Sequence, residues 1–171
     1  MIEWNEALDI ISKQELSRFY RSPEIAEKYA QAKVHDDENY GGLANYVAYK
    51  QLKWDNLDPA NPEFLKSNKD IKITRNRYPY YFEEDVVHLV VWTKVPIPSD
   101  SNGVTTEARK TINEFIDSYF VKKHGIAREN LAWFKNPVIL QTIPSIAHFH
   151  VLVRGSTHQK IEAILNDSVY I

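Results

Sequence analysis

Asp85–Val95, with the sequence DVVHLVVWTKV, is the stretch that decides the fold, because it carries the strongest strand signal in the chain. Valine, leucine and tryptophan favour extended backbone, and here they follow one another almost without interruption. The stretch ends at Pro96, whose missing N–H cannot take part in a strand ladder. Because strand residues two apart share a face, His88 and Trp92 are predicted to point to the same side of the sheet.

A second predicted strand, Ile146–Arg154, contains two histidines among apolar residues. His148 and His150 are two positions apart, so their side chains share a face and lie about 7 Å apart. An imidazole is costly to bury beside apolar side chains unless it is hydrogen-bonded or used in chemistry. The pair therefore has two interpretations: a functional pair of imidazoles, or two structural histidines bonded to backbone.

The remaining pattern predicts helices before the first strand and a mixture of strands and helices after it. A capping box at Ser12–Glu15 predicts the start of a short helix through Tyr20, and Ser22 followed by Pro23 predicts the start of another. The further elements that we expect are a helix end near Lys33, a polar loop at 35–39, a break at Gly41–Gly42, a helix over 43–52, a loop over 55–62, strands at 71–74 and 131–134, a helix from Thr105 or Thr106 to Gly125, and a helix over 157–165.

This order of elements predicts the fold class. A single long helix between pairs of strands fits an antiparallel sheet with helices packed on one side. We therefore predict an α+β fold in a single domain that spans residues 1–171. Residues 1–66 are expected to form a mainly helical N-terminal segment, and residues 71–171 the α+β core.

Composition argues against several classes of partner. The net charge is −2 and the pI is near 6.3, and no cluster of basic residues in the sequence indicates nucleic-acid binding. The chain has no cysteine, so it has neither a disulfide framework nor a thiolate zinc site. It has no apolar run of membrane-spanning length, and its first residues do not resemble a secretory signal, so we expect no membrane partner. We predict a cytoplasmic location, with the nucleus as a further one.

Several polar residues near the His-x-His strand are candidates for ligand contacts. His88 could face the histidine pair if its strand neighbours theirs, and a locally bonded histidine is the alternative. Arg154 shares the face of the pair and could hold an anion or remain solvated. Asn136 could bind a ligand hydroxyl and Ser145 a phosphate, or both could serve only in turns.

A resemblance to a known family covers most of the chain. The chain resembles the fungal N-acetylglucosamine-induced protein family, whose members are largely uncharacterised. The motifs that carry this resemblance are Asn76-x-x-Pro79-Tyr80, Asp85–Lys94, Trp133–Asn136 and His148–Val151. The family's name records induction by an amino sugar, and it implies no reaction.

A more distant resemblance, to the histidine-triad superfamily, covers residues 85–155. It rests on the order strand, helix, short strand ending in asparagine, and then Ser-aliphatic-x-His-x-His. The resemblance implies a HIT-like antiparallel sheet and a nucleotide or nucleotide-sugar ligand. It also implies hydrolysis or transfer of a nucleotidyl group through a covalent histidine, and a homodimer as in many members.

Residue by residue, this likeness assigns roles to the candidate site. It places His150 at the nucleophile position and His148 at the first motif histidine. Ser145 falls on the phosphate-contacting serine, and Asn136 on the asparagine near the substrate. Leu152 departs from the pattern, because it occupies the third triad position and can neither contact a phosphate oxygen nor donate a proton.

These observations leave several functional hypotheses. The first is a binder of a phosphorylated small molecule, with turnover through His150 left open by Leu152. The second is a non-catalytic regulatory protein of the same fold, linked to the response to N-acetylglucosamine. The third is a metal enzyme with His88, His148 and His150 as ligands, and the fourth is a protein-interaction module. We predict no cofactor and no resident metal.

Overall fold

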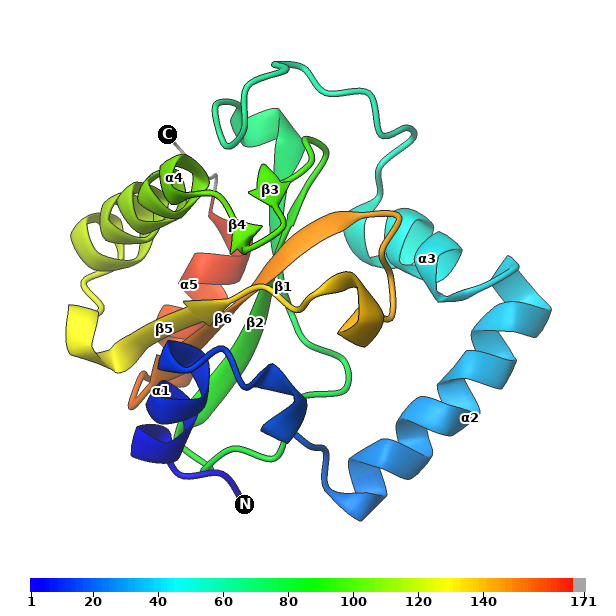
Figure 1. Cartoon of the computed structure of the whole chain (residues 1–171). Coiled ribbons are helices and arrows are strands. Elements are labelled where there is room, and N and C mark those ends of the chain that lie inside the picture. Colours follow the sequence, from blue (N-terminus) through cyan, green and yellow to red (C-terminus); the bar gives the residue numbers. More distant parts are fainter. Residues whose placement is uncertain (168–171) are drawn as a thin grey trace.

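The computed structural model describes residues 1–167 and has the predicted α+β architecture, with a four-stranded antiparallel sheet at its centre (Figure 1). The strands lie in the order β1-β2-β6-β5. Their bounds are β1 Ile71–Arg75, β2 Val86–Thr93, β5 Leu131–Phe134 and β6 Ala147–Arg154, and a small hairpin is formed by β3 Ser99–Asp100 and β4 Gly103–Val104. The two strongest predicted strands, β2 and β6, are therefore the two central ones.

Helices precede, interrupt and follow the strands. The α-helices are α1 Trp4–Ser12, α2 Pro23–Tyr40, α3 Leu43–Tyr46, α4 Thr106–Ile116 and α5 His158–Asn166. The shorter or wider ones are η1 Leu16–Arg18, η2 Val47–Leu52, η3 Asn68–Asp70, η4 Asp117–Lys123, η5 Arg128–Asn130 and η6 Val138–Leu140. Within residues 1–167, no helix is long and apolar enough to cross a membrane.

The register of β2 against β6 positions the histidines. Val90 lies opposite His150, and Trp92 lies opposite His148. His88 lies opposite Leu152, so it is a diagonal neighbour of His150 on the same face of the sheet. The proposed neighbourhood of His88 and the His-x-His strand is thus confirmed.

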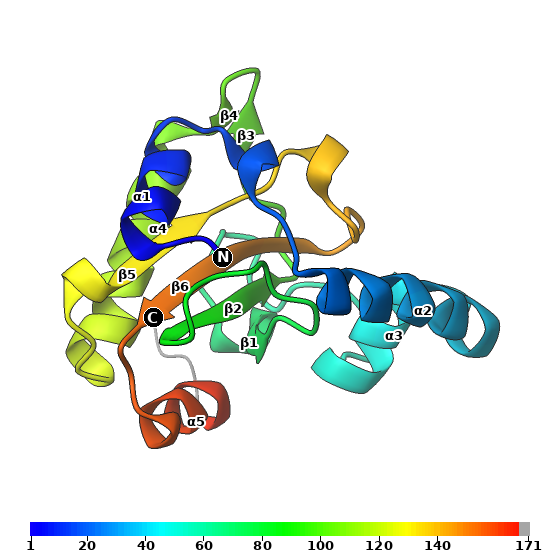
Figure 2. The same ribbon diagram turned by 90° about the horizontal axis from the view of Figure 1, so that it is seen from below.

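Helices cover both faces of the sheet, whereas the sequence predicted one covered face (Figures 1 and 2). On one face, α4 and α5 pack on the odd-numbered residues of β6, including Phe149 and Val151. On the other face, α1 packs near Leu152, and η2 packs over Val90 and Trp92. The second layer comes from the N-terminal third, so this segment helps to cover the face that carries the histidines.

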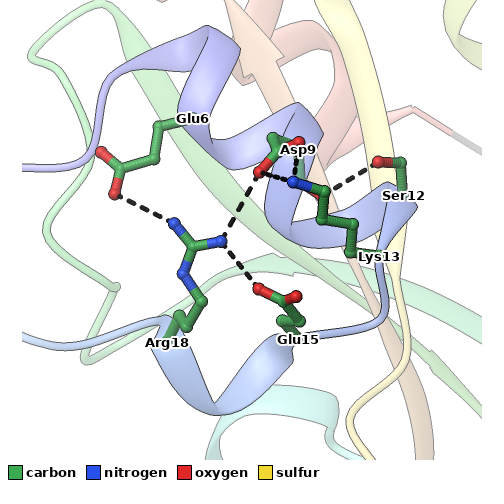
Figure 3. A network of polar contacts seen from close by, with 6 residues as sticks. All are labelled: Glu6, Asp9, Ser12, Lys13, Glu15 and Arg18. Atoms are coloured by element: carbon green, nitrogen blue, oxygen red, sulfur yellow. Dashed lines mark hydrogen bonds and ion pairs between the residues drawn. The ribbon is translucent and has the colours of Figure 1, made fainter.

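The N-terminal capping box was predicted wrongly. Ser12 ends α1 and its hydroxyl donates to the Asp9 carbonyl, while Glu15 pairs with Arg18 after the helix (Figure 3). The physical reason is packing, because α1 buries Trp4, Ala7 and Ile10 on one side, and this stripe ends before Ser12.

Helix α2 begins as predicted but ends later. The side chain of Ser22 accepts a hydrogen bond from the backbone N–H of Ile25, so the N-cap is confirmed. The polar stretch 35–39 is helical, although the sequence predicted a loop. Its Asp36 carboxylate is fully buried and accepts a hydrogen bond from Arg77 at 2.9 Å, which ties this last turn to the loop after β1. The helix then ends at Gly41, whose φ of 74° suits a glycine C-cap.

We expect Ser22→Ala to lower the free energy of unfolding by about 1 kcal/mol, because a helix N-cap is lost. Ser12→Ala is the matched control, since that hydroxyl caps no helix start, and it should cost less than half as much. Urea denaturation of the two variants and the wild type gives both values. Equal losses in the two variants would contradict the assignment of Ser22 as the working cap.

Candidate ligand-binding site

A cavity of about 90 Å³ lies over the histidine-bearing face, and we call it the histidine cavity. Its floor is formed by β2 and β6, where Val90, Trp92, His148 and His150 line it. Its walls come from four segments that are distant in the sequence: the approach to α2 and α2 itself, α3 with η2, the loop after β1, and the loop that contains η6. Figure 1 shows α2 and α3 to one side of the sheet.

His150 is held between two rings. Phe134 lies directly opposite it in the β5–β6 register, and the two rings stack with centroids 4.7 Å apart and planes within 10°. On the other side, Nδ1 of His150 is 2.9 Å from Nε2 of His88, a hydrogen bond between two buried imidazoles. His150 is 7% exposed. Packing and one hydrogen bond therefore fix the ring of His150, and Nε2 is its one polar atom without a described partner.

His88 has three polar neighbours and cannot satisfy all of them while neutral. The backbone N–H of Tyr80 points at its Nδ1 at 3.3 Å, and the side-chain nitrogen of Asn76 lies 3.3 Å from its Nε2. The side-chain oxygen of Asn76 accepts a hydrogen bond from the backbone N–H of Tyr78, so the side-chain nitrogen of Asn76 is the atom that faces His88, as a donor. A neutral imidazole carries one proton and one lone pair, so either the Tyr80 or the Asn76 donor goes unmatched.

These two tautomers of His88 present different groups to the cavity. If His88 carries its proton on Nε2, it accepts from Tyr80 and donates to Nδ1 of His150, which then carries a proton on its own Nε2. If His88 is protonated on Nδ1, it accepts from His150, whose Nε2 is then a lone pair. That Nε2 is buried and has no hydrogen-bond partner within residues 1–167. It is therefore an unpartnered donor or an unpartnered acceptor on a residue that lines the cavity.

His148 is fixed in a single tautomer. Its Nδ1 lies 2.7 Å from the Ile146 carbonyl oxygen, which can only accept, so Nδ1 carries the proton. Its Nε2 is therefore a lone pair. The ring packs against Trp92, with centroids 4.7 Å apart. The cavity thus contains one imidazole of fixed polarity and one whose polarity depends on His88.

All three imidazoles are neutral at pH 7. Burial, followed by the nearby positive charge of Arg21, lowers the pKa of His88 to about 3. Burial, and then neighbouring His88, holds the pKa of His150 well below its ordinary value. Burial also lowers the pKa of His148, although its hydrogen bond to Ile146 acts in the opposite direction. The histidines therefore recognise a ligand as neutral donors and acceptors.

Asn136 supplies a second unpartnered polar atom. Its nitrogen donates to the Tyr80 hydroxyl at 3.1 Å, and its buried oxygen has no partner among the described residues. Because a hydroxyl can either donate or accept, turning the amide over would leave the nitrogen free instead. Gln141 holds the backbone of Asn136 by donating to its carbonyl at 2.7 Å. One amide atom of Asn136 is thus available in either orientation.

The charge of the cavity wall is positive. Arg21, Arg75 and Arg77 line it, and no Asp or Glu is among its lining residues. Arg75 pairs with Glu162 at 3.0 Å, and Arg77 pairs with Asp36. Arg21 donates from Nε to the Tyr78 carbonyl, and its guanidinium lies over the rings of Tyr29 and Tyr80. Arg21 forms no ion pair with a carboxylate in the described part of the chain.

The structure brings some of the predicted site residues together and leaves others apart. His148, His150 and Asn136 line the cavity, and His88 supports His150 from behind. Ser145 is exposed and does not line it. Arg154 lies at the other end of β6, where it bonds Asn130 and covers the ring of Trp4.

The sequence interpretation missed two contributors to the cavity, Arg21 and Tyr80. Arg21 follows a short helical turn and precedes α2, a position that carries no motif. Tyr80 lies within the quoted aromatic segment, but nothing in that segment assigned it a contact with Asn136. Only the tertiary fold brings these residues to the histidines.

The geometry of His88 and His150 does not fit a shared metal ion. Their facing nitrogens are 2.9 Å apart and hydrogen-bonded to each other, whereas two nitrogens that each lie about 2.0–2.1 Å from one tetrahedral zinc ion would be about 3.3 Å apart. His148 directs Nδ1 at a carbonyl. Within residues 1–167, no group of three or more His, Cys, Asp or Glu is placed to hold a metal.

Comparisons with known proteins place the chain among fungal relatives. A family model described as "Protein of unknown function (DUF3605)" matches residues 3–154, which include the β-sheet and the histidines. N-acetylglucosamine-induced protein 1 of Candida albicans is 28% identical over 184 aligned positions, covering 95% of this chain and 72% of the relative. Uncharacterized protein YPL067C of Saccharomyces cerevisiae is 31% identical over 157 positions, covering 88% of this chain and 78% of the relative.

A solved structure has the same fold. The crystal structure of HTC1 matches with a TM-score of 0.79 and 28% sequence identity. The match covers 98% of this chain and 95% of the other. The N-terminal helices that wall the cavity are therefore part of a fold that both chains share.

Proposed function

Because the chain belongs to the DUF3605 family, whose members are proteins of unknown function, we propose a function from its own site: it binds a small phosphorylated metabolite in the histidine cavity. One observation carries the proposal. Nε2 of His150 and one amide atom of Asn136 are buried and unpartnered among the described residues, and both residues line the same cavity. Buried polar groups normally have hydrogen-bond partners, so two such groups in one cavity indicate a ligand that supplies them.

The sign of the charge supports an anion. Arg21 brings a guanidinium that no carboxylate neutralises among the described residues, and guanidinium groups suit the geometry of phosphate. His150 can add an N–H donor when His88 carries its proton on Nε2. A shift of tautomer in the His88–His150 pair can thus provide an N–H donor for a phosphate oxygen without any change in the net charge of the two imidazoles.

The size of the cavity limits what enters it. Pockets that hold a drug-sized ligand usually measure about 300–1,000 Å³, several times the volume of about 90 Å³ found here. The cavity therefore suits a phosphate or a similarly small group. The remainder of a larger ligand would extend past the exposed rim formed by Leu140 and Thr142.

A phosphorylated amino sugar is the first ligand to test. The Candida albicans relative is named for induction by N-acetylglucosamine, and this name motivates the choice. The chemistry is compatible, because an acetamido group both donates and accepts and could match the free amide atom of Asn136. In this proposal the chain is a binding protein and performs no turnover.

Nucleotidyl transfer through His150 is the second candidate, and one observation favours it. When His88 is protonated on Nδ1, Nε2 of His150 is a lone pair that could attack an α-phosphorus and form a phosphoramidate. The P–O bond to the leaving group would break, and that oxygen would need a proton. Leu152 cannot supply it, because its side chain is a hydrocarbon with no acidic proton, and it is fully buried among the apolar residues beneath α1. Binding without turnover is therefore the better-supported function.

Phosphorus NMR tests both candidates with a panel of sugar phosphates, nucleotides and nucleotide sugars. We expect the phosphorus resonance of at least one compound to broaden while no product resonance appears. The same compound should raise the melting temperature of the protein. A ligand at 100 times its Kd adds about 2.7 kcal/mol to the free energy of unfolding. His150→Ala should lose this effect, and the exposed His158→Ala should retain it.

The other outcomes decide between the candidates. New phosphorus resonances with the wild type and with His158→Ala, but not with His150→Ala, would establish nucleotidyl chemistry. A panel with neither broadening nor stabilisation would overturn both candidates and leave the histidines as structural residues.

A further inference from the structure

The strand β5 forms an edge of the sheet, and its outer side is open. It is the last strand in the order β1-β2-β6-β5. In an antiparallel pair, alternate residues turn their N–H and C=O groups away from the neighbouring strand. At the start of β5 the backbone is already bonded outside the sheet ladder: the cap N–H at Leu131 donates to the Arg128 carbonyl, and the Leu131 carbonyl accepts from the Arg128 side chain at 3.2 Å. Further along β5, no described residue forms a hydrogen bond to the outer backbone groups.

A groove of about 510 Å³ runs beside this edge. It is lined by the end of β5 and the residues that follow, including Trp133 and Lys135. Ile11 and Leu16, at the end of α1 and just after it, form its apolar side. On the α4 side it is lined by Arg109. Figure 1 shows β5 with α1 and α4 nearby, the elements that supply these walls.

The groove carries positive charge that no described carboxylate neutralises. Arg109 lies over the Trp133 ring and forms no ion pair with a described residue. Lys135 has no hydrogen bond or ion pair within residues 1–167, and burial lowers its pKa. No Asp or Glu lines the groove. Lys135 follows directly after β5 and lines the same groove as Trp133.

We infer that the open edge of β5 binds an extended acidic segment of a partner protein as an added antiparallel or parallel strand. The added strand would bond to the outer backbone groups of β5, as in other cases of β-augmentation. Its acidic side chains would face Arg109 and Lys135, and its alternate apolar side chains would face Ile11 and Leu16. The partner motif is thus an alternation of acidic and apolar residues.

Pairing of β5 with a second copy of this chain is disfavoured by the same charges. A two-fold pairing would bring Arg109 and Lys135 of both copies to one edge, with no acidic residue in the groove lining to compensate. Like charges across paired strands destabilise a sheet. The same positive charges that repel a second copy attract an acidic partner.

The test uses a capped peptide of about six residues in which glutamate and valine alternate, a length that covers β5 with a residue at each end. Titration of the full ¹⁵N-labelled chain should shift the backbone amides of residues 131–135. Arg109→Glu and Lys135→Glu should each raise the Kd at least about tenfold, because attraction becomes repulsion. Lys110→Glu, an adjacent exposed position on α4, should change it less than about twofold.

Two control peptides separate strand addition from plain charge attraction. A peptide with proline in place of valine keeps the charge but loses backbone N–H donors, so it should not bind. A peptide with lysine in place of glutamate should not bind either. Binding of the proline peptide with the affinity of the first, or the absence of any shift at residues 131–135, would overturn the inference. So would concentration-dependent dimerisation, measured by sedimentation, that protects those same amides.

Discussion

Arg21→Gln is expected to weaken binding of the phosphorylated ligand by about 10- to 100-fold. A hydrogen bond to a charged group is worth about 1.5–3 kcal/mol, and each 1.4 kcal/mol is a factor of ten in Kd. Arg21 lines the histidine cavity without a carboxylate partner among the described residues, so its charge is available to the ligand. Isothermal titration with the compound found by phosphorus NMR measures the change.

Arg18→Gln is the matched control for this substitution. Arg18 is three residues away, but it pairs with Glu6, Asp9 and Glu15 at the surface beside α1 (Figure 3). It does not line the cavity. We therefore expect its loss to leave the Kd within about twofold of the wild-type value, since exposed ion pairs contribute little.

Equal affinity of the two variants for the ligand would contradict this prediction. If Arg21→Gln and Arg18→Gln bind the ligand equally well, Arg21 does not recognise its charge, and the ligand is held by the neutral groups alone. The Kd should also rise with ionic strength for the wild type and less so for Arg21→Gln, because the variant lacks the screened charge.

The strands were predictable from the sequence because their signals are local. β2 and β6 are largely apolar and rich in valine and aromatic residues, with proline or glycine within a few residues after them, and the structure places them where expected. α1 was not predicted, because its buried stripe of Trp4, Ala7 and Ile10 is only three residues long. The polar stretch 35–39 was assigned to a loop, since nothing local shows that Asp36 is buried against a distant arginine.

The candidate site was predictable only in part, for a related reason. His148 and His150 stand out in one strand, and His88 follows from the pairing of two strong strands. Arg21, the cavity arginine without a carboxylate partner among the described residues, joins His148 and His150 from more than a hundred residues away along the chain. Ser145 was chosen for its position just ahead of the His-x-His strand and by resemblance, and the structure places it on the surface outside the cavity.

Acid should destabilise this protein well before its carboxylates titrate. The unfolded state takes up a proton on His88 near pH 6.5, whereas the folded state does not do so until about pH 3. The stabilising effect of this low folded-state pKa is therefore complete above pH 6.5 and is lost as the pH falls toward 3. Between pH 7 and pH 5, His88 alone should remove about 2 kcal/mol from the free energy of unfolding.

His150 should act in the same direction, because burial and then His88 hold its pKa well below the ordinary value. His88→Gln removes one of the two titrating imidazoles. It also removes the repulsion by which a charged His88 lowers the pKa of His150. The variant is expected to be less stable at pH 7, where it loses the hydrogen bond to His150, yet its stability should fall less steeply toward pH 5.

Urea denaturation at half-unit pH steps separates these two effects, since the slope reports proton uptake and the offset reports lost contacts. His158→Gln, a substitution at an exposed position, should keep the slope of the wild type. If His88→Gln and the wild type gave parallel curves between pH 7 and pH 5, His88 would be as easily protonated in the folded protein as in the unfolded one. A buried neutral imidazole could then not set the tautomer of His150, and the donor or lone pair that the cavity offers would need another origin.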